Sequence, residues 1–404
     1  MKKILGIYDY IFAILLIGLP FSKALPNILL PLLGLLFLLN IKNVNFKPLL
    51  KPPFALLYVL LVYIFIKGLV VQNIFIEWSH FKKYLIVFII PVLLLNLKNI
   101  NTIKVSMVIC VQSVIWVSIA VITINYLTTG SLPFTNGEKV NQLLVMERPY
   151  AGFFAVLGFL FSLNLINKHP RYKTCLMASA VITVLFVLLI AARISFLTLI
   201  IMLGIYILFY SKLPSKLRGF IIAGSVAIVA VLFIFNDNMA KRFFIEESWE
   251  ESVAVASDYE PRLVIWPCAA GMAQKTSYNL LTGFKTNKEI ETNYINCYSG
   301  IIKNPSKKEY YLSEKFNSHN QFIDIALSQG LLGLLLFSGF LISLLLHVHK
   351  NFFYTAILIA LMLFLLVENV LYRQAGCYIF SIFATIISIN PYAYNVKNEG
   401  NTCS

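Results

Sequence analysis

The chain has 404 residues, of which 59% are hydrophobic and 13% are charged, and its mean hydropathy is +0.80. Soluble domains have about 25% charged residues, so the composition excludes a soluble globular protein, and it also excludes disordered, collagen-like and disulfide-scaffold classes. The net charge of +15 would suggest nucleic-acid binding in a soluble domain, but the 32 Phe and 21 Tyr fit lipid-facing surfaces better than base stacking. We therefore predict an all-α, polytopic integral membrane protein with no nucleic-acid partner.

The apolar stretches predict about twelve transmembrane helices, with eleven or thirteen as alternatives, because a spanning helix needs about 20 apolar residues. Met1-Lys2-Lys3 before the first stretch is typical of a signal peptide, but Asp9 lies inside that stretch and more spans follow, so we predict an uncleaved first helix. The predicted spans are centred near Ala13, Leu32, Val62, Phe88, Val117, Val156, Val181, Met202, Ala227, Leu335, Ile359 and Ile382.

The basic residues predict the orientation of these helices. With the N-terminus inside, fifteen Lys and Arg fall in cytoplasmic segments, eight fall in short outward loops and helix ends, and ten fall in one long outward loop. The positive-inside rule counts short loops only, so fifteen against eight predicts that both termini are cytoplasmic. In a bacterium the outward side is the periplasm.

One polar segment interrupts the apolar pattern, from about Asn236 to Ser318. It carries eleven of the 18 acidic residues, and a loop of this length is more often functional than a spacer. We therefore divide the chain into helices 1–9 (residues 1–235), the long loop (236–320), and helices 10–12 with a short tail (321–404). Within the loop we predict polar helices over 236–260, a helix that opens after Pro261, and a turn over 304–308.

His319 is the most notable polar residue, because it stands where the long loop meets the next span. We expect Ser318 or Asn317 to cap that helix, which would place the imidazole at the positive helix terminus and favour its neutral, proton-accepting form. Downstream, Gly330 and Gly333 would allow close packing against a neighbour. The alternative is that His319 is a polar residue at the interface.

Several cations lie at the outer ends of separate helices, where guanidinium groups could bind a lipid-linked diphosphate bidentately. Each has an alternative: snorkelling for Arg193, a salt bridge to Glu260 for Arg262, and headgroup contact for Arg148 and Lys83. Near the outer end of the eleventh span, the sequence favours a structural role for Glu368, Asn369 and Arg373, which could pair with one another or with a neighbouring helix.

The chemistry is also limited by what the sequence lacks. It has no Walker A loop, Rossmann glycine pattern, metal-ligand spacing or Asp-x-Asp, so we expect neither a cofactor nor a metal. Energy would then come from an activated bond of the substrate. Cys268 and Cys297 lie in the outward loop, where a disulfide between them would add about 3 kcal/mol of stability on the chain-entropy model. The sequence leaves open whether they are bonded.

Three features occur in a characteristic order: Ala192-Arg193-Ile194-Ser195 at the end of a span, Pro261-Arg262-Leu263-Val264-Ile265-Trp266 in a long outward loop, and His319-Asn320 followed by Gly330. In this order the chain resembles the O-antigen ligase superfamily, which also contains O-antigen polymerases and protein O-oligosaccharyltransferases. The span arrangement agrees throughout, and the specific motifs lie between about Arg193 and Gly333.

The resemblance implies a GT-C-like, metal-independent and inverting glycosyltransferase in the bacterial inner membrane, with its active site facing the periplasm. The implied partners are an undecaprenyl-diphosphate-linked glycan donor, a lipid A-core acceptor and membrane lipids. His319 would be the general base, and Arg193 and Arg262 would hold the diphosphate and stabilise the leaving group. Arg148 and Lys83 match loosely as further diphosphate contacts.

Other functions remain as alternatives. An O-antigen or capsule polymerase would use the same donor with a second carrier-linked glycan as acceptor, and it often has two comparable loops. The protein-glycosylating branch often carries an extra periplasmic domain, for which the tail after Asn390 is short. A transporter or flippase would show broken helices at corresponding places in two halves. A structural scaffold would not depend on His319.

Overall fold

The part of the chain that the structure describes is helical. In this computed structural model these residues are 2–71, 74–75, 77–130, 137–166, 168–211, 214–220, 223–224 and 260–399, and they form helices and no β-strand. Six helices are long and apolar enough to cross a membrane, and four shorter helices are also apolar. The prediction of an all-α polytopic membrane protein is confirmed.

The predicted spans agree with the helices. Eleven of the twelve predicted centres fall inside a helix, and the remaining centre, Ala227, lies outside the described residues, as do residues 236–259 of the predicted loop. Pro20 lies between the first two helices, α1 (Lys2–Gly18) and α2 (Ala24–Asn40), as expected for a residue that lacks a backbone donor.

The chain forms two compact units, each discontinuous in sequence. Unit 1 comprises Met1–Val44, Leu95–Glu246 and Lys350–Ala360, and unit 2 comprises Asn45–Leu94, Glu247–His349 and Leu361–Ser404. The boundary between them falls inside helix α17 (Phe352–Leu365). The division of the sequence at residues 235 and 320 stays a prediction about topology.

Unit 1 is built around α7 (Arg148–Ile166), which packs against three helices, α5 (Ile100–Thr129), α8 (Lys173–Leu189) and α9 (Arg193–Ile205). Gly158 allows this close approach, because a Cβ there would overlap the side chain of Val111 on α5. Helix α1 packs on α5 and on α2. The shorter elements described in this unit are η1 (Ile41–Asn43), α6 (Gly137–Leu143), η3 (Pro170–Tyr172) and η4 (Tyr206–Tyr210).

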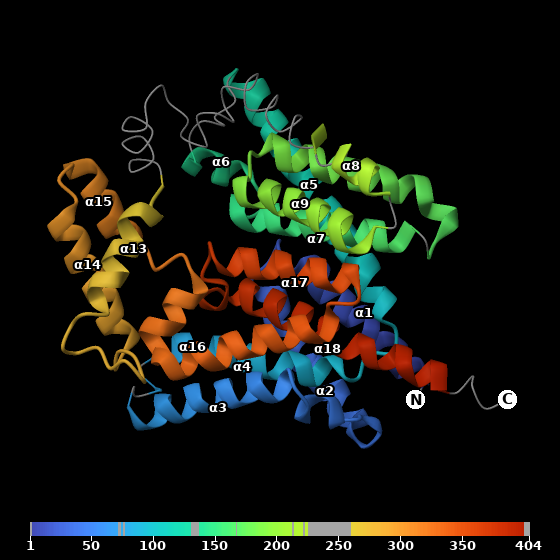
Figure 1. The fold of residues 1–404 in the computed structure, drawn as a ribbon, viewed down its shortest axis with the longest axis horizontal. Helices are drawn as coiled ribbons and strands as arrows, with labels where there is room; N and C mark the ends of the chain where they lie inside the picture. The colour runs from blue at the N-terminus through green and yellow to red at the C-terminus, as the bar shows by residue number, and fades with distance from the viewer. Residues whose placement is uncertain are drawn as a thin grey trace. The chain divides into compact units, whose positions relative to one another are not determined.

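Unit 2 contains two pairs of packed apolar helices (Figure 1). Helix α16 (Gln321–Val348) packs on α3 (Phe54–Val70), and α18 (Gln374–Glu399) packs on both α4 (Trp78–Leu94) and α16. Two 3-10 segments complete this part, η2 (Lys47–Leu50) and η5 (Val370–Tyr372). Both ends of α16 are polar, so its apolar middle is the part suited to lipid.

Helix α16 contains a break at Gly330, where φ is 67° and ψ is −164°. This conformation is essentially restricted to glycine. At this break α16 packs against a second turn, which has a positive φ at Gly283. Two backbone hydrogen bonds join the segments: Phe284 N donates to Leu327 O at 2.8 Å, and Leu331 N donates to Leu280 O at 2.8 Å. The expected close packing at Gly330 is therefore found, and its partner is the backbone of residues 280–284.

The described part of the long loop forms a compact group of three helices, coloured yellow to orange in Figure 1: α13 (Arg262–Met272), α14 (Asn287–Ile301) and α15 (Pro305–Glu314). The helix predicted to open after Pro261 is confirmed as α13. The turn predicted over 304–308 is wrong, because Asn304 caps α15 by accepting from Lys307 N and Pro305 occupies the first helical position. Proline at that position favours a helix.

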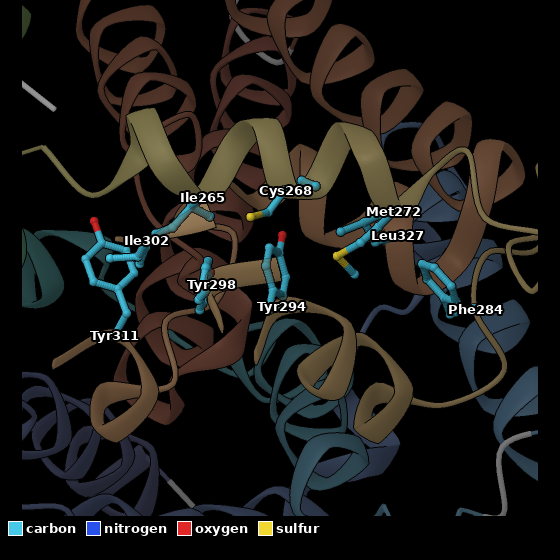
Figure 2. Packing of buried hydrophobic residues seen from close by; sticks show 10 residues of the cluster. Ile265, Cys268, Met272, Phe284, Tyr294, Tyr298, Ile302, Tyr311 and Leu327 are labelled. Atoms are coloured by element: carbon cyan, nitrogen blue, oxygen red, sulfur yellow. The ribbon is translucent and has the colours of Figure 1, made fainter. Parts of the chain in front are cut away.

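A core of its own holds these loop helices together (Figure 2). Cys268 and Met272 on α13 face Tyr294 and Tyr298 on α14, and all four side chains are buried. Cys268 and Cys297 are bonded as a disulfide between the same two helices. The phenol of Tyr298 donates to Phe316 O at 3.0 Å, which fixes the chain just before His319.

Candidate active site

His319 lies in the segment that joins the loop helices to α16, in unit 2. Its φ is +43°, in the left-handed region that residues other than glycine occupy only occasionally. Its backbone N–H donates to Asn317 Oδ1 at 3.1 Å, and the preceding carbonyl, Ser318 O, accepts from Trp266 Nε1 at 3.1 Å. These two hydrogen bonds hold the turn that carries the imidazole.

Asn320 caps α16, since its Oδ1 accepts from the backbone N–H groups of Phe322 and Ile323. The prediction that Ser318 or Asn317 would be the cap is wrong. Ser318 instead donates from its hydroxyl to Asn369 Oδ1 at 2.8 Å, and Asn369 Oδ1 also accepts from Asn320 N at 2.6 Å. The cap lies two residues after Ser318, whose hydroxyl makes this buried contact instead.

Glu368 is the charged partner of His319. Its carboxylate is 5% exposed, and its Oε2 lies 3.5 Å from His319 Nδ1. Burial by itself would raise the pKa of Glu368, but the hydrogen bond and charge of His319, together with Arg262 and Arg373, hold that pKa below its usual value. Glu368 is therefore an anion at neutral pH and faces one nitrogen of the imidazole.

Arg262 contacts the same carboxylate from the first position of α13. Its Nη2 lies 3.5 Å from Glu368 Oε1 and donates to Val367 O at 2.6 Å, while its Nη1 pairs with Glu260 Oε1 at 2.6 Å. The salt bridge to Glu260 considered from the sequence is therefore present. The side chain keeps 22% of its surface exposed, so its unused N–H donors can still reach a ligand.

Lys83, on α4, belongs to the same unit but to a neighbouring polar pocket. Its ammonium lies 4.3 Å from the centre of the Tyr372 ring, and the His80 ring centre lies 5.4 Å from that of Tyr372. Tyr372 follows Glu368 by four residues, so η5 connects this pocket with the His319–Glu368–Arg262 cluster.

Arg193 and Arg148 lie at the same end of unit 1. Arg193 begins α9, Arg148 begins α7, and both side chains are partly exposed. One turn after Arg148, Gly152 packs directly against Ala192 and Ser195, which flank Arg193. The N-termini of two packed helices therefore accompany the two guanidinium groups, an arrangement suited to an anion.

Two residues of the cluster carry more than the sequence suggested. Glu368 and Asn369 were expected to pair structurally, and they do, but their partners are His319 and Arg262 for the first and Ser318 and Asn320 for the second. The sequence shows an acidic residue and an amide residue at the end of an apolar span. It does not reveal which distant polar residues these two side chains contact.

The donor set does not suggest a metal centre. Within the described ranges, no three His, Cys, Asp or Glu side chains are arranged to hold a metal ion. The cluster instead pairs one imidazole with one carboxylate and one guanidinium. Chemically, this set can take a proton from a hydroxyl group and stabilise the cation that results.

A comparison with protein-family models matches residues 178–338 to the family described as O-antigen ligase. The match begins within α8 and ends within α16, so it includes Arg193, Arg262, His319 and the break at Gly330. The predicted resemblance to this superfamily is confirmed. The match supports ligase or polymerase activity in general, in a membrane glycosyltransferase-like enzyme that acts on lipid-linked glycans. No curated protein sequence matches the chain.

Proposed function

We propose that the protein is an O-antigen ligase of the bacterial inner membrane. It transfers a polysaccharide from undecaprenyl diphosphate to a sugar hydroxyl of lipid A-core at the periplasmic face. The observation that carries the proposal is the contact of His319 Nδ1 with the buried Glu368, beside Arg262. His319 and Arg262 lie within the segment that matches the O-antigen ligase family, and Glu368 lies after it.

His319 acts as the general base. Because Nδ1 faces the Glu368 carboxylate, Nδ1 carries a proton and Nε2 is the nitrogen free to accept one. Nε2 takes the proton of the acceptor hydroxyl as that oxygen bonds to the anomeric carbon of the donor. The bond from the anomeric carbon to the diphosphate breaks, and its electron pair leaves with undecaprenyl diphosphate. Glu368 stabilises the imidazolium, and this single displacement inverts the anomeric centre.

The cations stabilise the leaving diphosphate. We assign this role to Arg193, Arg148, Arg262 and Lys83, because guanidinium and ammonium groups favour the charge that develops on phosphate oxygens. Support comes from the partly exposed side chain of Arg262. It also comes from the packing of α7 against α9 near their N-termini, where Arg148 and Arg193 lie. No metal has a part in the proposal, and EDTA should leave transfer by the purified enzyme unchanged.

A polymerase is the second candidate, since the family match includes that activity in general. A deletion strain analysed on lipopolysaccharide gels separates the two. Loss of all polymer from lipid A-core, with polymer still built on the carrier, indicates a ligase, whereas caps of one repeat indicate a polymerase.

The base is tested by complementing that strain with His319→Ala. We expect no transfer, with the variant still inserted in the membrane at the wild-type level. His349→Ala is the matched control, because His349 is exposed at the other end of α16. Near-wild-type transfer by His319→Ala would remove His319 as the base and favour a scaffold role.

A further inference from the structure

The turn that packs against the break in α16 exposes two leucines. Residues 279–283 fold back on themselves, and the turn closes where Gly283 N donates to Asn279 O at 2.7 Å. At its tip the side chains of Leu280 and Leu281 are 65% and 53% exposed. Single surface leucines are ordinary, so the surroundings of these two decide what they contact.

The backbone N–H groups of the turn bond within the protein. Leu281 N and Thr282 N both donate to Asn279 Oδ1 at 3.0 Å. The next two N–H groups donate to a carbonyl of the turn and to a carbonyl of α16. The four successive N–H groups of residues 281–284 therefore need no water.

The carbonyl groups of residues 280–282 are also occupied. Leu280 O accepts from Leu331 N at 2.8 Å, and Leu281 O accepts from Leu332 N at 3.2 Å. The next carbonyl accepts from the buried ammonium of Lys67 on α3. A turn in water can leave such groups to the solvent, whereas backbone at membrane depth must find its partners within the protein. The tip therefore meets the requirement for lipid contact and presents two apolar side chains.

The partners of the tip on α16 place it at one end of an apolar span. Leu331 and Leu332 are the first residues after the break and are 37% and 43% exposed, and Leu335, one turn further, is 60% exposed. The next charged residue of the chain is Lys350. The exposed apolar surface of a membrane span is the surface that contacts lipid, and the leucines of the tip extend it beyond the break.

We propose that Leu280 and Leu281 insert into the bilayer at the end of α16 nearer to His319, where they contact lipid acyl chains just below the headgroups. Because α14 follows this turn directly, the contact fixes the loop helices at the membrane surface. This insertion is independent of the reaction that the protein catalyses.

The test places a genetically encoded fluorescent amino acid at Leu281 and measures the emission of that probe with the protein in lipid nanodiscs. Lipids that carry a spin label near the headgroup should quench the probe about twofold, and iodide in the water should quench it much less. The same probe at Leu335 is the reference for lipid contact. It should be quenched best by lipids labelled further along the acyl chain, because Leu335 lies deeper in the span.

Ile301 is the matched control on the loop helices. It is 51% exposed at the end of α14, close to the 53% of Leu281, and the polar residues Lys303 and Asn304 follow it. A probe at Ile301 should be quenched by iodide and not by the labelled lipids. Each labelled protein should keep the thermal midpoint of wild type, because the replaced side chains are exposed. If the probe at Leu281 lowers that midpoint, the same measurement at Leu280 decides.

Quenching of the probe on the turn by iodide, and not by lipid, would overturn the insertion and place the turn in water. Protection from both quenchers would also overturn it, since protein would then cover the tip, either another segment of the chain or a second copy. Equal quenching by lipid at Ile301 would show that the contact is not specific to the turn, and would contradict the proposal as well.

Discussion

His319 stands on a backbone conformation that costs about 1–3 kcal/mol, and the surrounding contacts offset this cost. Asn317 accepts from the backbone N–H of His319, and Trp266 and Asn369 bond to the backbone of Ser318 and Asn320 on either side of it. Strained residues that are held in this way cluster at functional sites. The turn places Nδ1 3.5 Å from Glu368 Oε2, and in the proposed mechanism Nε2 is the nitrogen that meets the acceptor hydroxyl.

Glu368→Gln should lower the transfer rate about 100-fold, because an amide cannot stabilise the imidazolium that forms on His319. The KM values should change little, and Glu368→Asp should restore part of the rate. Glu291→Gln is the control, since Glu291 makes an exposed pair with Lys315. A rate for Glu368→Gln within twofold of wild type would contradict the assignment of this carboxylate.

The same substitution has an effect on stability that depends on pH. The pKa of Glu368 is lower in the folded protein than its ordinary value. Its contribution to the free energy of unfolding is therefore complete above the ordinary glutamate pKa and is lost as the pH falls through the lowered folded value. Thermal unfolding in detergent should show wild type more stable than Glu368→Gln at neutral pH, with the difference shrinking on acidification.

Arg193→Lys should also be strongly impaired, by about tenfold or more, because an ammonium cannot reproduce a bidentate contact with phosphate. The assay is transfer by the purified enzyme at varied donor concentration. Arg171→Lys provides the comparison, since Arg171 is exposed on η3 and lies over the Tyr172 ring. Full activity of Arg193→Lys would mean that Arg193 only extends to the headgroup region.

At the scale of elements, the crossing of α16 with residues 280–284 fixes the geometry of unit 2. Gly330 and Gly283 both have positive φ, and a Cβ on either would strike the backbone of the other segment. The buried Lys67 of α3 donates from its ammonium to the carbonyls of Thr282, Phe284 and Ser328, so the crossing also carries hydrogen bonds from a third element.

Gly330→Ala should therefore destabilise the protein by about 2–4 kcal/mol, from the strained conformation and the overlap with Leu281 together. The measurement is the midpoint of thermal unfolding in detergent. Gly339→Ala is the matched control on the same helix, because the nearest atom to its Cβ would be Leu56 Cδ1 at 3.9 Å. Equal midpoints for the two variants would show that the break at Gly330 tolerates a side chain.

Apolar periodicity predicts elements well because each span satisfies its own backbone hydrogen bonds and is therefore specified locally. Arg262 and His319 were also found from sequence, since their positions after Pro261 and at the loop end are local features. Glu368 meets both of them from more than forty residues away. Such pairings depend on how helices pack, which no local pattern encodes.

At the scale of the whole molecule, each unit gathers segments from distant parts of the sequence. Unit 2 takes α3 and α4 from the first quarter of the chain and joins them to the loop helices, α16 and α18. The partners of His319 and Arg262 are thus set by long-range helix packing. Because both units are discontinuous in sequence, residues 178–338, which match the family, include parts of both units and the whole of neither.

The topology can be tested on α16, whose straight part after the break at Gly330, residues 331–348, extends about 27 Å, close to the roughly 30 Å of a bilayer's hydrocarbon core. We therefore expect its two ends to lie on opposite sides of the membrane, with His319 before one end and Lys350 after the other. The excess of basic residues in short loops predicts that Lys350 is cytoplasmic and that His319 is periplasmic. Fusions truncated after Lys98 and Lys350 should fluoresce with a reporter that folds in the cytoplasm, whereas a fusion after Lys275 should activate alkaline phosphatase. The reverse pattern would move the proposed active site to the cytoplasmic face and exclude transfer to lipid A-core in the periplasm.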